Sequence, residues 1–158
     1  MLCIPSLAYA ERLNTALTRC EPYREEIEDI LREYELSTDF FFLALAESTC
    51  DLEAHSKTGA VGLWQLMPAT ARHYGLVVNS EVDERLNWRK STHAAARYLK
   101  HLNERFGEFD WVIAAYSIGG HNLIKRTGKR RNDGMRIGVI KGSAAYSLAR
   151  TVNLWRKQ

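Results

Sequence analysis

Glu47 is the residue whose type and position first indicate chemistry. It directly follows the apolar run 40–46, Phe-Phe-Phe-Leu-Ala-Leu-Ala, so it is expected at the C-terminal end of a buried helix. Apolar surroundings disfavour the carboxylate anion and the negative end of the helix dipole disfavours it further, so both effects raise its pKa. A carboxyl group that stays protonated near neutral pH can act as a general acid. The alternative is a glutamate that emerges into water or pairs with an arginine.

Three short blocks with characteristic spacing accompany this glutamate. Glu47-Ser48 is followed by Ser56 and by the run 57–71, Lys-Thr-Gly-Ala-Val-Gly-Leu-Trp-Gln-Leu-Met-Pro-Ala-Thr-Ala, and Ala-Tyr-Ser-Ile-Gly stands at 115–119. Glycine lacks a Cβ atom, so the glycines of the central run allow its backbone to approach a ligand closely. The loss of helical periodicity over 49–62, together with Gly59 and Gly62, predicts a loop in this part of the chain.

These blocks resemble the family 1 lytic transglycosylases, bacterial enzymes with a goose-type lysozyme-like fold that cleave peptidoglycan. The family pattern runs E-S, then S-x-x-G-A-x-G-L-M-Q-L-M-P-x-T-A, then A-Y-N-A-G. The resemblance covers residues 39–123, and the Trp64 variant G-L-W-Q is most similar to the membrane-bound type D branch. It implies a mainly α, lysozyme-like domain with a catalytic cleft, and peptidoglycan glycan strands as the partner.

The resemblance also implies a mechanism. Glu47 protonates the oxygen between N-acetylmuramic acid and N-acetylglucosamine and then, as a carboxylate, takes the proton of the muramic C6 hydroxyl. That oxygen attacks C1 and leaves a 1,6-anhydro end. The residues that match substrate-binding positions are Ser56, Gln65, Met67, Tyr116 and Tyr146. Each of them alone could equally be a capping serine, a surface glutamine or a core methionine or tyrosine.

Two departures from the family pattern bear on the cleft. Ser117 replaces the asparagine of A-Y-N, and Gly142 replaces the glutamate of a late E-T-x-x-Y block whose tyrosine is Tyr146. The first change removes an amide contact, and the second removes a secondary carboxylate. Neither affects Glu47, so the chain is expected to be an active enzyme.

Two other functions compete with this interpretation. One is a hydrolytic, lysozyme-like muramidase, in which Asp51 or Glu53 would position water; we expect both side chains to be solvated instead. The other is a weakly active structural component that binds peptidoglycan. The basic stretch 125–136 suggests a nucleic-acid module, but the remaining chain is not basic, so no nucleic-acid partner is expected.

The elements that must position these residues are helices, because no segment shows the strict alternation typical of a strand. Apolar periodicity, cap-forming residues and glycines predict helices and two irregular segments, 49–62 and 128–142. The chain is expected to form one domain, 11–158, that comprises N-terminal helices (11–38), a motif-bearing core (39–123), and a basic segment with a last helix (124–158). The predicted helices are 21–36, 39–48, 68–75, 91–106, 110–118 and 143–155.

We expect an exported enzyme that acts as a monomer. The chain has 158 residues and a formal net charge of +3, and its apolar runs are too short to span a membrane. Residues 1–10 end in Ala-Tyr-Ala, which suggests a signal-peptide remnant and thus a periplasmic or otherwise exported protein. A frayed apolar strand is the alternative for this segment.

The cysteines and histidines bear on disulfide formation and on metal binding. Cys20 and Cys50 could form a disulfide in an oxidising compartment, or remain two buried thiols, which we favour because a sequence cannot bring two Cα atoms into bonding range. No metal or cofactor is expected, because none of the histidines has a metal-ligand spacing. The histidines are His55, His73, His93, His101 and His121.

Overall fold

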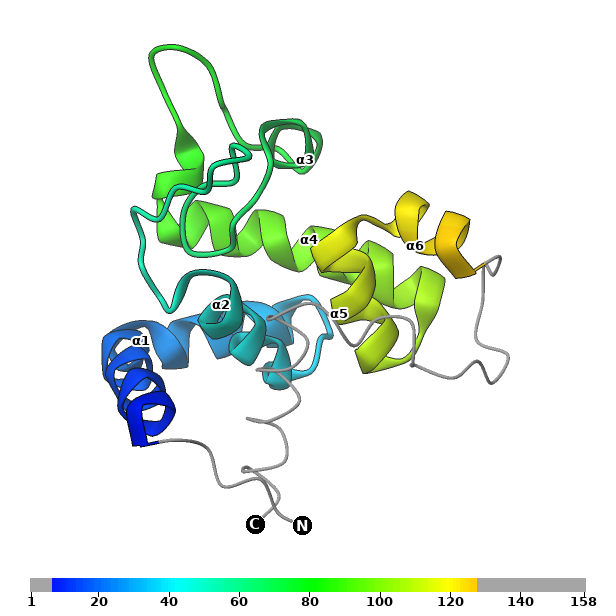
Figure 1. Ribbon diagram of the computed structural model, residues 1–158. Helices are drawn as coiled ribbons and strands as arrows, with labels where there is room; N and C mark the ends of the chain where they lie inside the picture. Colours follow the sequence, from blue (N-terminus) through cyan, green and yellow to red (C-terminus); the bar gives the residue numbers. More distant parts are fainter. Residues whose placement is uncertain (1–6, 128–158) are drawn as a thin grey trace, which may run out of the picture.

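The computed structural model describes residues 7–127 as a helical domain (Figure 1). Among these residues the extended pairings are isolated bridges rather than strands. The mainly α class predicted from the sequence is confirmed. The described part of the chain contains, in order, α1 (Leu7–Glu33), η1 (Thr38–Phe40), α2 (Phe41–Ser48), α3 (Pro68–His73), η2 (Glu84–Leu86), α4 (Trp88–Phe106), α5 (Phe109–Ile118) and α6 (Gly120–Thr127), where η marks a short 3-10 helix.

Helix α1 is longer than the sequence predicts. It begins at Leu7 rather than at residue 21 and continues through Pro22. An internal proline removes one helical hydrogen bond and usually breaks a helix. Ala16 and Cys20 are nevertheless buried on the N-terminal side of Pro22, so packing supports the helix on both sides of the proline.

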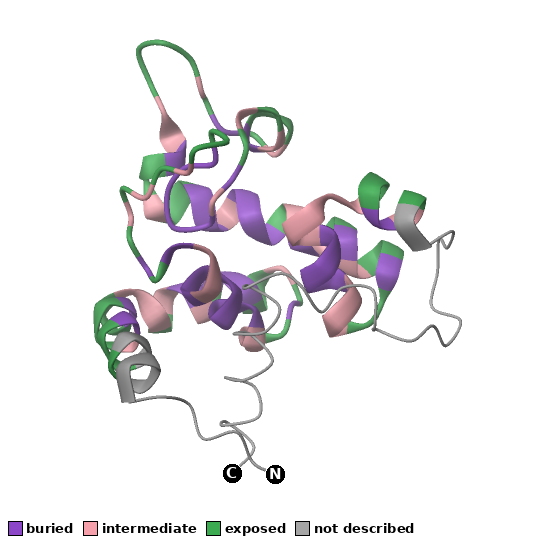
Figure 2. Cartoon of the chain, in the orientation of Figure 1, coloured by how far each residue is buried: buried purple, intermediate pink, exposed green. Residues whose placement is uncertain are grey.

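Helices α1, α2, α4 and α5 contain most of the core, and Figure 2 colours their buried residues purple. Helix α4 packs against α1, α3 and α5, and α2 packs against α1. Ser37 caps the η1 turn, where its Oγ accepts a hydrogen bond from the Asp39 amide at 3.2 Å, so the chain turns into α2 at the predicted place. Helix α2 is buried because it is apolar. Five of its eight residues are buried hydrophobic side chains: Phe41, Phe42, Leu43, Ala44 and Leu45.

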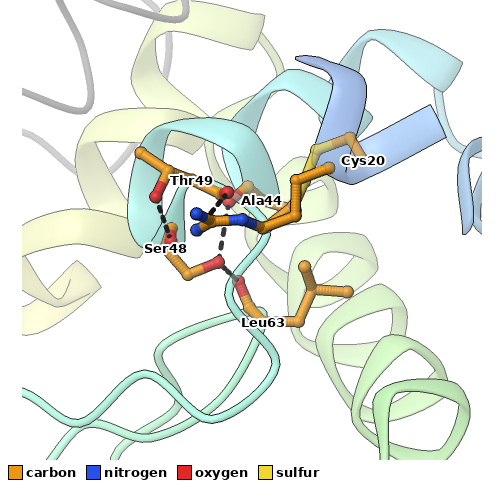
Figure 3. The surroundings of a disulfide bond; sticks show 7 residues. Cys20, Ala44, Ser48, Thr49 and Leu63 are labelled. Atoms are coloured by element: carbon orange, nitrogen blue, oxygen red, sulfur yellow. Dashed lines mark hydrogen bonds between the residues drawn. A yellow bond between two sulfur atoms is a disulfide. The ribbon is translucent and has the colours of Figure 1, made fainter. Parts of the chain in front are cut away.

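A disulfide joins Cys20 of α1 to Cys50, just beyond α2 (Figure 3). The two Cα atoms lie 5.2 Å apart. The preference for two free thiols was therefore wrong, because the packing of α1 on α2 brings the pair into range, and sequence spacing does not contain that information. Closing a loop of 30 residues is worth about 3–4 kcal/mol on the chain-entropy model.

Candidate active site

Glu47 lies in the last turn of α2, as the sequence predicts, and its side chain is largely buried. Burial raises the pKa of this carboxyl group to about 7, against an ordinary value of 4.5. Ser117 of α5 donates a hydrogen bond from Oγ to Glu47 Oε1 at 3.4 Å, and this contact partly opposes the effect of burial. A carboxyl with this pKa is divided between its acid and base forms at neutral pH, so it can give and accept a proton.

The loop between α2 and α3 is fixed by hydrogen bonds from both sides of this carboxyl group. Ser48, next to Glu47, donates from Oγ to the Leu63 carbonyl at 2.8 Å (Figure 3). Tyr116, next to Ser117, donates from its hydroxyl to the Trp64 carbonyl at 2.7 Å. Two successive carbonyls of the loop are thus held by α2 and α5, which fixes the loop relative to the acid.

The same loop folds around Gly62. This residue has a φ of +79°, and a Cβ atom there would lie 2.2 Å from the Arg85 carbonyl oxygen, so only glycine fits. Gln65 also has a positive φ, +48°, and its Nε2 donates to the Ala54 and Gly62 carbonyls at 3.1 and 2.9 Å. The side-chain amide of Gln65 therefore stabilises the loop from within.

Arg85 supports the loop from the segment between α3 and α4. Its buried guanidinium pairs with Asp83 and donates to the Gly59 and Leu66 carbonyls at 2.9 and 3.0 Å. The sequence analysis did not identify Arg85. It lies well after the loop in the chain, and no local pattern connects the two.

A cleft of about 240 Å³ is lined in part by Ser117, the residue that donates a hydrogen bond to Glu47. Three of the predicted substrate-binding residues line it, namely Gln65, Met67 and Tyr116, and the Met67 side chain is 43% exposed at its mouth. Within the described chain, no carboxylate belongs to its lining, which comprises Gln65, Leu66, Met67, Thr70, Tyr98, Tyr116, Ser117, Ile118 and Gly119.

The structure does not bring Ser56 to this lining. Its Oγ accepts a hydrogen bond from the Ala60 amide at 2.8 Å and shares another with the Thr58 hydroxyl at 3.1 Å. In this structure Ser56 therefore closes a turn, which is the alternative role considered from the sequence. Tyr146 lies outside the described residues.

A row of three tyrosines leads from α3 to the acid. Tyr74 stacks on Tyr98 with ring centroids 5.1 Å apart, and Tyr98 stacks on Tyr116 at 5.2 Å. Burial raises the pKa of Tyr98 to about 12, and burial together with the negative charge of Glu47 raises the pKa of Tyr116. Tyr98 and Tyr116 thus stay protonated at physiological pH. Neither hydroxyl therefore carries a negative charge into the cleft.

Residues 7–127 contain no group of three or more histidine, cysteine, aspartate or glutamate side chains placed to hold a metal ion. Over the same residues, no helix combines the length and the apolar character needed to cross a membrane. Asp51 and Glu53 are exposed, as expected for solvated side chains.

The fold and the site define a helical domain with one largely buried acid beside an open cleft. The sequence profile of the family described as "Transglycosylase SLT domain" matches residues 27–137. Over 123 residues the chain is 33% identical to membrane-bound lytic murein transglycosylase D of Escherichia coli strain K12, in an alignment that covers 75% of this chain and 27% of the relative. The chain belongs to the transglycosylase SLT domain family, and it spans about a quarter of that relative's length.

Solved structures share the fold. An inactive mutant of lytic transglycosylase Slt from Pseudomonas aeruginosa superimposes with a TM-score of 0.61 at 19% identity, covering 82% of this chain and 22% of that one. The 70 kDa soluble lytic transglycosylase of Escherichia coli gives 0.54 at 20% identity, covering 79% of this chain and 24% of that one. The expected lytic transglycosylase-type fold is confirmed.

Proposed function

We propose that this chain is a lytic transglycosylase that cleaves the β-1,4 bond between N-acetylmuramic acid and N-acetylglucosamine in peptidoglycan. The observation that carries the proposal is Glu47, a largely buried carboxyl group with a pKa of about 7, which lies beside Ser117 at the cleft. Its protonated form gives a proton to the glycosidic oxygen. Its ionised form then takes the proton of the muramic C6 hydroxyl, whose oxygen bonds to C1 and closes the 1,6-anhydro ring.

The lining of the cleft favours this reaction over hydrolysis. A hydrolytic glycosidase normally uses a second carboxylate as base or nucleophile. Among the described residues that line the cleft there is no such group, and Asp51 and Glu53 are exposed to solvent. In the proposed reaction the substrate supplies what the second carboxylate would, because the muramic acetamido oxygen stabilises C1 until the C6 oxygen attacks. That attack is intramolecular, so much of its entropic cost is already met by the sugar ring.

The remaining residues have supporting roles in this proposal. Met67 and Tyr116 contact the muramic ring from the cleft wall, and Gln65 shapes the wall through its bonds within the loop. Tyr146 contributes a further hydroxyl, as the resemblance implies, whereas Ser56 closes its turn in the loop and does not bind the acetamido group. The protein acts as an exported monomer on glycan strands and needs no cofactor.

Digestion of purified sacculi tests the proposal. Wild-type protein should release muropeptides with 1,6-anhydromuramic ends, which are lighter by one water than the reducing ends left by a hydrolase. Glu47→Gln should abolish release, because general acid–base help is worth roughly 10²–10⁴-fold per role. Glu53→Gln makes the same chemical change at an exposed position of the following loop and should remain active.

Other outcomes would point to different functions. Reducing ends from the wild type would show a hydrolytic muramidase. Binding to sacculi without any release would show a structural peptidoglycan-binding component. An active Glu47→Gln protein would place the acid elsewhere.

A further inference from the structure

The disulfide lies very close to Glu47 along the chain. Only Ser48 and Thr49 separate Glu47 from Cys50. Cys20 and Cys50 are 0% and 1% exposed, so the bond is enclosed in the core between α1 and the end of α2. Figure 3 shows Thr49 and Ser48 beside the disulfide, with Leu63 of the loop below them. A covalent link to α1 therefore begins at Thr49–Cys50, the two residues by which the chain leaves α2, which we call the exit of α2.

The backbone at this exit has an unfavourable conformation. Thr49 and Cys50 have φ values of +52° and +56°, in the left-handed region that residues with a Cβ atom rarely adopt. For a β-branched residue such as Thr49 this conformation is especially costly. Such conformations persist only where the surrounding structure enforces them, and they are frequent at functional sites.

Helix α1 supplies two of the attachments that hold this conformation. Arg19 donates from Nη1 to the Thr49 carbonyl at 3.4 Å, and Cys20 bonds to Cys50. Within α2, the Thr49 amide donates to the Leu45 carbonyl at 2.9 Å. Two adjacent residues of α1 thus hold two adjacent residues that follow α2, and the disulfide is the one covalent attachment among these.

This exit determines how the last turn of α2 lies. The helix has eight residues, so Glu47 and Ser48 are part of its final turn and depend on how the chain leaves it. We propose that the Cys20–Cys50 disulfide is a positioning device for the acid: it holds the left-handed exit of α2, so that Glu47 stays buried against Ser117 at the cleft. The catalytic consequence rests on the proposed function, but the positioning of Glu47 does not.

The pKa of Glu47 reports how deeply its carboxyl group is buried, because the side chains around it carry no charge near neutral pH. Helix α5 contributes Ser117 and Tyr116 to the surroundings of Glu47. Helix α4 contributes Tyr98, whose ring packs on that of Tyr116. All three are uncharged near neutral pH. Arg19 of α1 is bonded to the Thr49 carbonyl rather than to the carboxyl group. The pKa of Glu47 is therefore raised mainly by burial, and it falls if the last turn of α2 loosens and admits water.

The test is a titration of Glu47 by carbon-13 NMR in protein labelled at the glutamate carboxyl groups. The Glu47 signal is assigned by its loss in Glu47→Gln. In the oxidised wild type the midpoint should lie near 7. In the Cys20→Ala/Cys50→Ala pair it should fall by roughly one pH unit or more, which is a tenfold change in the ratio of protonated to ionised carboxyl. The high-pH limit of sacculus digestion should fall with it.

A matched control separates positioning from general stability. Ile30→Ala removes a buried side chain of α1 away from the exit of α2, so it should lower the unfolding temperature and leave the Glu47 midpoint unchanged. An unchanged midpoint in the folded alanine pair would overturn the proposal. So would failure of both this pair and Cys20→Val/Cys50→Ala to fold, because the disulfide would then be a requirement of the fold itself.

The two proposals fail in different ways. If the wild type does not digest sacculi but the NMR midpoint still falls on removing the disulfide, the proposed function is wrong and the positioning holds. If digestion occurs and the midpoint does not move, only the positioning is wrong.

Discussion

Ser117 and Glu47 are 70 residues apart in the chain, and Ser117 Oγ donates a hydrogen bond to Glu47 Oε1 at 3.4 Å. The contact joins the end of α2 to α5 and stabilises the ionised form of the carboxyl group. A hydrogen bond to the charged form of an acid lowers its pKa. Burial and this hydrogen bond therefore act in opposite directions, and burial dominates.

The first prediction removes this hydrogen bond. Ser117→Ala should raise the pKa of Glu47 above its present value of about 7, because burial then acts unopposed. The high-pH limit of glycan cleavage should shift upward accordingly, which a pH–rate profile on sacculi would measure. Ser117→Thr keeps a hydroxyl and is the matched control. Equal profiles for alanine and wild type would mean that the contact does not affect ionisation.

The second prediction concerns stability against pH. Since the folded pKa of Glu47 is raised from 4.5 to about 7, its contribution is fully present below pH 4.5 and is lost as the pH rises through 7. Ionisation should thus lower the free energy of unfolding by about 3 kcal/mol above this range, at ~1.4 kcal/mol per pKa unit. Glu47→Gln should lack this loss.

Urea denaturation of wild type and Glu47→Gln between pH 4 and 8.5 measures the effect. The stability difference should grow in favour of the variant between about pH 4.5 and 7 and then level off. Glu53→Gln, at an exposed position, should follow the wild-type curve. Parallel curves for Glu47→Gln and wild type would show that the carboxyl is hydrated in solution.

The third prediction concerns the loop glycines. Gly62→Ala places a Cβ atom 2.2 Å from the Arg85 carbonyl oxygen at a φ of +79°, so the loop or Arg85 must move. We expect a loss of more than about 2 kcal/mol of stability, since steric overlap adds to the left-handed strain. Gly59→Ala is the control: its φ is +94°, but nothing lies within 4 Å of the added atom. Thermal unfolding of both variants would show whether overlap with Arg85 matters.

The fourth prediction concerns Tyr116. Tyr116→Phe removes the hydroxyl that donates to the Trp64 carbonyl at 2.7 Å. Leaving a buried acceptor unpaired costs about 1–3 kcal/mol, and the loop that lines the cleft should loosen. Turnover should therefore fall while circular dichroism shows an intact fold. Tyr34→Phe, which also loses a hydroxyl but does not line the cleft, should retain turnover. Full activity of Tyr116→Phe would reduce this tyrosine to a core residue.

The sequence by itself determined the class of the fold and the position of the acid. Apolar periodicity, caps and glycines are local signals, so α2, α3, α4 and α5 appear within a few residues of their predicted bounds. The burial of Glu47 could be inferred because its own helix is apolar nearly all round. The cleft residues Gln65, Met67 and Tyr116 were expected from the resemblance of the motif blocks to the family pattern, and they line the cleft.

Only the tertiary structure decided which distant residues meet. The Cys20–Cys50 bond, the Arg85 contacts beneath the loop and the Ser117–Glu47 hydrogen bond each join segments that local patterns leave independent. The course of α1 through Pro22 was decided in the same way, because its packing offsets a local preference to end the helix. These features depend on how helices approach one another in space, and sequence spacing within a single helix carries no information about that approach.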